Sequence, residues 1–120
     1  MRRLLVLEEV GLLTLAIFLL SQLDYSWWIF PVLFFVPDVS LFAYAGGPRL
    51  GAIVYNLLHH RGVGIVAYML GVLVPSDLFQ LVGLVILGHA SFDRIFGYGL
   101  KYPDAFKHTH LGWIGGAPDR

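Results

Sequence analysis

The stretch LLVLEEVGLLTLAIFLLSQL, residues 4–23, decides the fold class of this chain. Its length matches the roughly 20 helical residues that cross a hydrocarbon core of about 30 Å. Arg2 and Arg3 precede it, and DYSWW at residues 24–28 follows it, which is the aromatic composition of a membrane interface. The run is too long for the apolar part of a signal peptide, and no small-residue cleavage site follows it. The sequence therefore predicts a transmembrane helix.

Three more apolar segments, at about residues 27–44, 49–74 and 77–98, are separated by short breaks that contain glycine, proline or aspartate. Of the 120 residues, 58% are hydrophobic and 13% are charged, whereas about 25% are charged in a soluble domain. Short connections make neighbouring helices antiparallel. We therefore expect one domain, residues 1–120. We expect this domain to be an all-α up-down bundle of four transmembrane helices, with residues 99–120 as a cytosolic interfacial tail.

Two of these segments carry signs of a break. Pro31 and Pro37 should bend the segment at residues 27–44 and free backbone carbonyls. The string HHRGVG at residues 59–64 predicts either a kink or the end of a half-helix that lines a cavity.

The charges around the segments predict an orientation. With the N-terminus inside, the flanking basic residues all lie at or beyond the cytosolic helix ends, while the two outer loops carry only Asp24 and Asp77. We therefore expect both termini in the cytosol. The flanking basic residues used for this orientation are Arg2, Arg3, Arg49, Arg94, Lys101, Lys107 and Arg120.

Two features of the composition exclude classes of function. A net charge of zero argues against a nucleic-acid partner, and the absence of cysteine excludes thiolate chemistry.

Polar side chains inside the predicted helices gather at one depth. An ionisable residue at a helix centre costs about 2.5–3.5 kcal/mol on insertion scales, so each needs a partner or a function. At about 1.5 Å per residue, all four helices present such residues to the cytosolic half of the membrane. His89 and Asp93 are four residues apart, so they share a helix face, as metal ligands in bundles do. The full set is Glu8, Glu9, Asp38, Asn56, His59, His60, His89 and Asp93.

Simpler interpretations of these residues stay open. His89 and Asp93 could form a buried hydrogen-bonded pair that only holds helices together. Arg61 could pair with Asp38, which would make both structural. His110, in the tail, could be solvated.

Four strings along the chain carry a further signal: PD at 37–38, YNLLH at 55–59, HASFDRIFGYGLKY at 89–102 and THLG at 109–112. Together they resemble a family of small bacterial membrane proteins known only as a domain of unknown function. The resemblance covers nearly the whole chain and implies location in the bacterial inner (cytoplasmic) membrane, as a multi-pass protein. It favours His59 over His60, and His110 over His108, as the motif histidines. Glu9, where a glycine is more usual, departs from the pattern.

The leading interpretation is a metal-dependent membrane hydrolase that acts on a lipid or another amphiphile. The chain is also similar, more loosely, to small inner-membrane proteins described as metal-dependent hydrolases. The expected ligands of a divalent metal, zinc or iron, are His59, His89, Asp93 and His110. The expected catalytic residues are Glu8 as proton acceptor, Asp38 and Asn56. The residues expected to hold an anionic headgroup are Arg94 and Lys101.

Other functions remain open beside this one. Facing histidines on the last two predicted helices could ligate a b-type haem. The polar layer could also form a proton or ion path in a homo-oligomer. Finally, the chain could be an accessory subunit of a larger membrane complex, with the polar layer holding its helices together.

Overall fold

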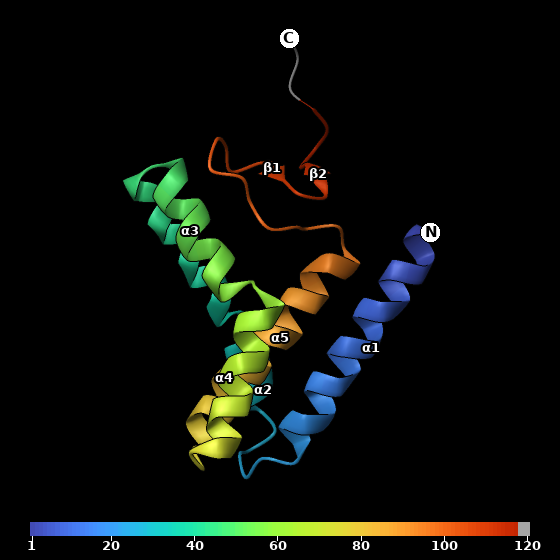
Figure 1. Cartoon of the computed structure of the whole chain (residues 1–120), viewed down its shortest axis with the longest axis vertical. Coiled ribbons are helices and arrows are strands. Elements are labelled where there is room, and N and C mark those ends of the chain that lie inside the picture. The colour runs from blue at the N-terminus through green and yellow to red at the C-terminus, as the bar shows by residue number, and fades with distance from the viewer. Residues whose placement is uncertain (118–120) are drawn as a thin grey trace.

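The computed structural model describes residues 1–117, so Arg120, one of the charges used for the orientation, lies outside the described residues. The N-terminus and a small hairpin lie at one end of the molecule, and the loops that follow α1 and α4 lie at the opposite end (Figure 1). The described elements are α1 (Arg2–Ser21), α2 (Ile29–Phe34), the 3₁₀ helix η1 (Val36–Gly46), α3 (Pro48–Leu58), α4 (Arg61–Leu73), α5 (Asp77–Ile95), β1 (His108–Thr109) and β2 (Gly112–Trp113).

Much of the helical surface is apolar. Within the described residues, three segments are long and apolar enough to cross a membrane, namely Arg2–Ser21, Ile29–Gly46 and Asp77–Ile95, while Arg61–Leu73 is a shorter apolar helix. Large side chains such as Phe18 and Phe42 are exposed. Because lipid, unlike water, solvates such a surface well, the all-helical architecture indicates a membrane protein.

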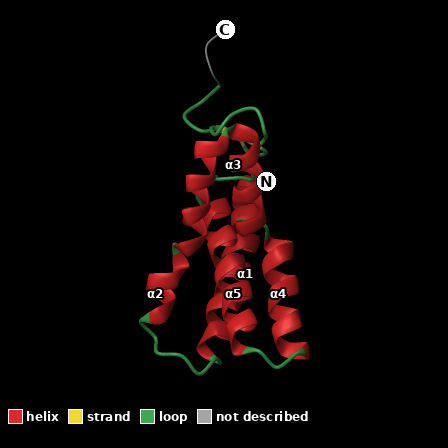
Figure 2. Ribbon diagram, turned by 90° about the vertical axis from the view of Figure 1, so that its left-hand side faces the viewer, coloured by secondary structure: helices red, strands yellow, loops and turns green. Residues whose placement is uncertain are grey.

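Neither of the two middle segments forms one continuous α-helix. The segment expected at residues 27–44 is divided, because α2 ends at Phe34 and η1 begins at Val36, next to Pro37, which lacks a backbone N–H. The segment expected at residues 49–74 is divided between Leu58 and Arg61, so the half-helix interpretation is confirmed. In Figure 2, α3 occupies the upper half of the bundle and α4 the lower half.

Helix α5 is the central support of the molecule. Glycines let α4 approach it closely, because a Cβ placed on Gly64 would lie 2.7 Å from both the Gly83 carbonyl oxygen and the Leu87 nitrogen. On another side, a Cβ on Gly88 would lie 3.4 Å from the Cβ of Ala16 in α1. Small residues at such contacts let helices pack where lipid removes the hydrophobic driving force. The unbroken α5 thus gives the two divided segments a fixed surface.

Candidate metal centre

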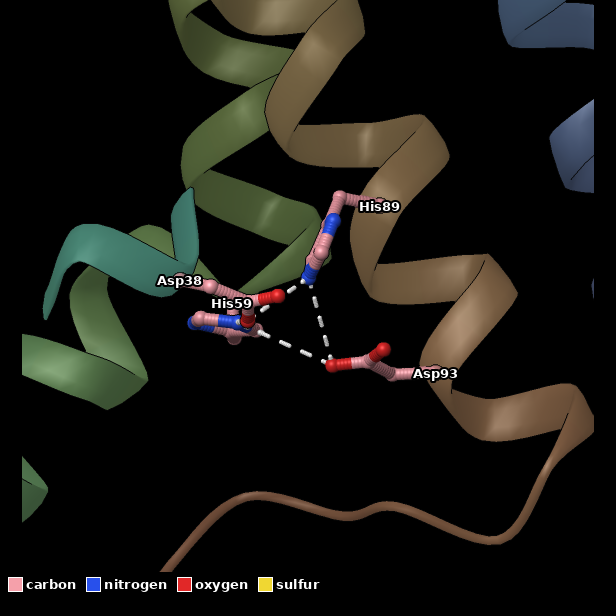
Figure 3. A group of neighbouring side chains, drawn as sticks. All are labelled: Asp38, His59, His89 and Asp93. Atoms are coloured by element: carbon pink, nitrogen blue, oxygen red, sulfur yellow. Dashed lines mark hydrogen bonds and ion pairs between the residues drawn. The ribbon is translucent and has the colours of Figure 1, made fainter. Parts of the chain in front are cut away.

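Four polar side chains converge where the two divided segments meet α5 (Figure 3). Asp38 comes from the first turn of η1, His59 directly follows α3, and His89 and Asp93 lie on successive turns of α5. One possible ligand atom from each residue lies within 4.8 Å of all the others. The fold therefore brings together residues as far apart along the chain as Asp38 and His89, which are separated by 51 positions.

The distances within this group suit a bound metal ion. The Nε2 atom of His59 is 3.2 Å from Asp38 Oδ1 and 3.6 Å from Asp93 Oδ2. The corresponding distances from Nε2 of His89 are 3.1 and 3.5 Å. Zinc bonds of about 2.0–2.1 Å to nitrogen and oxygen place tetrahedral ligands roughly 3.3 Å apart. The four distances between imidazole nitrogens and carboxylate oxygens are close to that spacing.

Backbone carbonyls determine which nitrogen of each imidazole faces the group. The Nδ1 atom of His59 is 2.8 Å from the carbonyl oxygen of Tyr55, and Nδ1 of His89 is 2.7 Å from that of Phe34. A carbonyl only accepts, so each Nδ1 carries the hydrogen and each neutral ring turns the lone pair of Nε2 inward. Metal-binding histidines in proteins are oriented in this way.

The carbonyl that holds His89 is free because of a proline. In a 3₁₀ turn the Phe34 carbonyl would accept from residue 37, but Pro37 has no N–H. In an α-helix it would accept from Asp38, but the Asp38 N–H bonds the Phe35 oxygen instead, at 3.0 Å. The break between α2 and η1 thus supplies an acceptor beside the metal centre.

The end of α3 frees the second carbonyl. The N–H of His59 bonds the Asn56 oxygen at 3.3 Å, so the His59 ring takes the place of that N–H on the Tyr55 oxygen. The carbonyl of His59, which has lost its helical partner, accepts from Nη2 of Arg94 at 3.1 Å. Side chains thus supply partners for the Tyr55 and His59 carbonyls at this break, as burial requires.

Tyr55 is a residue of the centre to which the sequence analysis assigned no role. Its ring stacks on the His59 ring, with centroids 3.7 Å apart and planes 10° apart. Its hydroxyl donates to Asp93 Oδ2 at 3.4 Å. The four-residue spacing from His59 is the signal that could have identified it, because such residues share a helix face.

Two carboxylates face two imidazoles in this group, so a positive charge among them, from a cation or from protonated imidazoles, would balance it. Because both Nδ1 atoms hold a hydrogen, neutral rings have none left to give to Asp38 or Asp93. A divalent cation would neutralise the two carboxylates, and zinc, iron and manganese suit mixed imidazole and carboxylate ligands. The haem alternative does not fit this geometry. Asp38 Oδ1 lies against both Nε2 atoms, in the space that a porphyrin plane would need.

Two of the predicted site residues hold the tail in place. The side chain of Asn56 donates to the Lys101 carbonyl at 2.8 Å and accepts from the Lys101 N–H at 2.7 Å. Arg94 is buried and donates to the carbonyls of His59 and Tyr98. Asn56 and Arg94 therefore position the chain around the centre, and neither side chain reaches it.

Two other predicted site residues lie outside the group. Glu8 is exposed, and His110 accepts from a backbone N–H of the tail through Nδ1, at 2.8 Å. Both line a separate groove of about 550 Å³. Partial burial lowers the pKa of His110.

The interpretation that Arg61 pairs with Asp38 is wrong, because Arg61 forms its ion pair with the buried Glu9, at 2.5 Å.

A pocket of about 260 Å³ opens beside the four-residue group. It reaches the carboxylates, since 42% of the Asp38 side chain and 13% of the Asp93 side chain are exposed, while both imidazoles are sealed from solvent. The centre is thus closed on its histidine side and open on its carboxylate side. The pocket is lined by Asp38, Leu41, Tyr55, Asp93, Tyr98, Lys101, Phe106 and Ile114.

Comparison with known families identifies the chain. Residues 2–114 match the family described as a domain of unknown function, DUF4260. The chain belongs to this family. Membership of a family of unknown function, which the resemblance implied, is thereby confirmed, and the DUF4260 match covers all four residues of the centre. No curated protein and no solved structure matches the chain.

Proposed function

We propose that this DUF4260 protein is an intramembrane metalloenzyme that hydrolyses an amphiphilic ester with the help of one zinc or iron ion. His59, His89 and Asp93 would be its ligands. The observation that carries the proposal is the matched orientation of the two buried imidazoles, each held by a carbonyl on Nδ1 with Nε2 turned toward the same carboxylates. A histidine pair that served packing alone would have no need of this shared orientation.

The membrane topology that we propose has four spans, with both termini in the cytosol of a bacterial cell and the chain in its inner membrane. In this topology α2 with η1 forms the second span, and α3 with α4 forms the third. The support is the charge pattern, since Asp24 and Asp77 are the only ionisable side chains in the two loops assigned to the outside apart from tyrosines. The broken third span would be tolerated because its free carbonyls bond side chains inside the protein.

In the proposed mechanism Asp38 is the proton acceptor, in place of the more distant Glu8. A bound zinc ion would lower the pKa of its water to about 7. The carboxylate of Asp38, which is the more open of the two to the pocket, would accept a proton from the water that attacks the ester centre. As the bond to the leaving alcohol breaks, Asp38 would return this proton to the alcohol oxygen, so that one water is consumed and an acid and an alcohol are released.

The ligand assignment is tested by metal analysis of protein purified in a mild detergent. One zinc or iron ion per chain is expected in the wild type and in a His60→Ala/His108→Ala control, which removes two histidines outside the group. The ion should be lost in the His59→Ala/His89→Ala variant. A folded wild-type protein without metal would overturn the proposal and leave the polar layer as a contact that holds the helices together.

The catalytic assignment has a separate test. Asp38→Asn should keep the metal and lose hydrolysis of short-chain lipid esters by about 100-fold or more, as expected for removal of a general base. Full activity in this variant would exclude Asp38 as the proton acceptor.

A further inference from the structure

Lys101 is a buried cation with an incomplete set of partners. Only 6% of the residue is exposed. Its ammonium donates to the Phe106 carbonyl at 2.9 Å and lies over the rings of Tyr55 and Phe106, 4.7 and 3.9 Å from their centroids. Within residues 1–117, no carboxylate lies within the 4.0 Å of an ion pair. Lysine is rarely buried unless it is paired, so this ammonium can still accept an anionic partner.

An anionic partner would have room to bind, because Lys101 lines the same pocket as Asp38 and Asp93. Those two carboxylates face the imidazoles, where the divalent ion of the proposed centre would balance their charge. Burial lowers the pKa of Lys101, and the charge of Asp93 acts in the opposite direction. With a divalent ion neutralising the two aspartates, the pocket would keep the single positive charge of the ammonium.

The rest of the pocket suits a hydrocarbon group. Leu41, Phe106 and Ile114 form its apolar wall. Arg94, the other residue expected to hold a headgroup, is not a lining residue of this pocket, and its guanidinium already bonds two carbonyls. Recognition of an anion beside the metal centre therefore falls to Lys101 alone.

We infer that the pocket binds an amphiphile with one anionic phosphate or carboxylate group, which the Lys101 ammonium contacts while the alkyl part lies against Leu41, Phe106 and Ile114. This inference rests on the proposed function, since it makes the anionic amphiphile the substrate of the metal centre. It names the class of substrate: a single-chain or short lipid ester with a negative charge close to the bond that is cleaved.

The test is calorimetric titration of the full chain in a neutral detergent with octyl phosphate and, separately, octanoate. The variant is Lys101→Gln, and the matched control is Lys107→Gln, which removes an exposed lysine of the same tail. Binding of at least one of the two amphiphiles should weaken about tenfold or more in Lys101→Gln, because a buried charged hydrogen bond is lost. It should be unchanged in Lys107→Gln. Lys101→Arg, which keeps the charge, should retain most of the binding if the tail is folded.

The outcomes separate this inference from the proposed function, because the metal content is measured in the same samples. Equal binding to wild type and Lys101→Gln, or no binding to either, overturns the inference even if the wild type holds its metal. Metal-free wild type that still binds octyl phosphate through Lys101 supports the anion site and overturns only the metalloenzyme. Inorganic phosphate that binds as tightly as octyl phosphate overturns the assignment to an amphiphile.

Discussion

Replacement of Pro37 by alanine tests whether a helix break orients the metal centre. Pro37 leaves the Phe34 carbonyl without a backbone donor, and His89 donates to that carbonyl at 2.7 Å. Pro37→Ala restores an N–H at the position from which a 3₁₀ turn bonds Phe34. The new N–H would compete with His89 for one oxygen, so the imidazole would lose its fixed orientation while all four side chains of the centre remain.

The size of the effect follows from the contact that is weakened. Loss of an outer hydrogen bond to a metal-binding histidine typically reduces metal affinity by about 10- to 100-fold. This corresponds to about 1.4–2.8 kcal/mol of binding free energy. The zinc affinity of Pro37→Ala should therefore be about 10- to 100-fold lower than that of the wild type. The reduction should be smaller than that of His89→Ala, which removes a ligand.

The assay is zinc competition with a chromophoric chelator in detergent, with helical content checked by circular dichroism. Pro31→Ala is the matched control, because Pro31 is an exposed proline of α2 and the carbonyl three residues before it, that of Trp28, binds no histidine. Its zinc affinity should equal that of the wild type. Zinc affinity of Pro37→Ala within about twofold of the wild type would refute the reasoning, since the carbonyl of Phe34 would then have no part in orienting His89.

Three further predictions concern packing, the tail and the anion pocket. Gly64→Ala should destabilise the fold by about 1–3 kcal/mol in a denaturing-detergent titration, because its Cβ would collide with α5, whereas Gly11→Ala, which meets nothing within 4 Å, should not. Asn56→Ala should speed hydrogen exchange of the Lys101 amide by about tenfold or more, since both side-chain bonds to the tail are lost, and unchanged exchange would exclude this clamp. Because burial lowers the pKa of Lys101, octyl phosphate binding should decline as the pH rises, beginning below the 10.5 usual for lysine, and Lys101→Arg should not show this decline.

Much of the candidate site was predictable because helix geometry relates sequence spacing to depth and face. The shared face of His89 and Asp93 follows from their four-residue spacing alone, and their ligand atoms lie 3.5 Å apart. The choice of His59 over His60 came from the resemblance. The structure gives its physical basis, since His60 caps α4 and accepts from the Val63 N–H.

Other residues could not be assigned from the sequence, because their partners depend on how the helices are rotated and where they end. Arg61 pairs with Glu9 on α1, a contact between residues 52 positions apart. The place of His110 in a groove that Glu8 also lines likewise depends on where the tail lies relative to α1.

By itself, the sequence determined that this protein is mainly helical and apolar enough for lipid, but not where two of its helices break. Hydrophobicity and segment length are local properties, and in lipid they leave the backbone little choice but the helix. Only the tertiary structure decided the chemistry of the centre. It set two helix breaks at one level against α5, so that the freed carbonyls of Phe34 and Tyr55 orient His89 and His59, and it left the Lys101 ammonium buried beside them. Contacts of this kind join segments far apart along the chain, and no spacing within one helix encodes them.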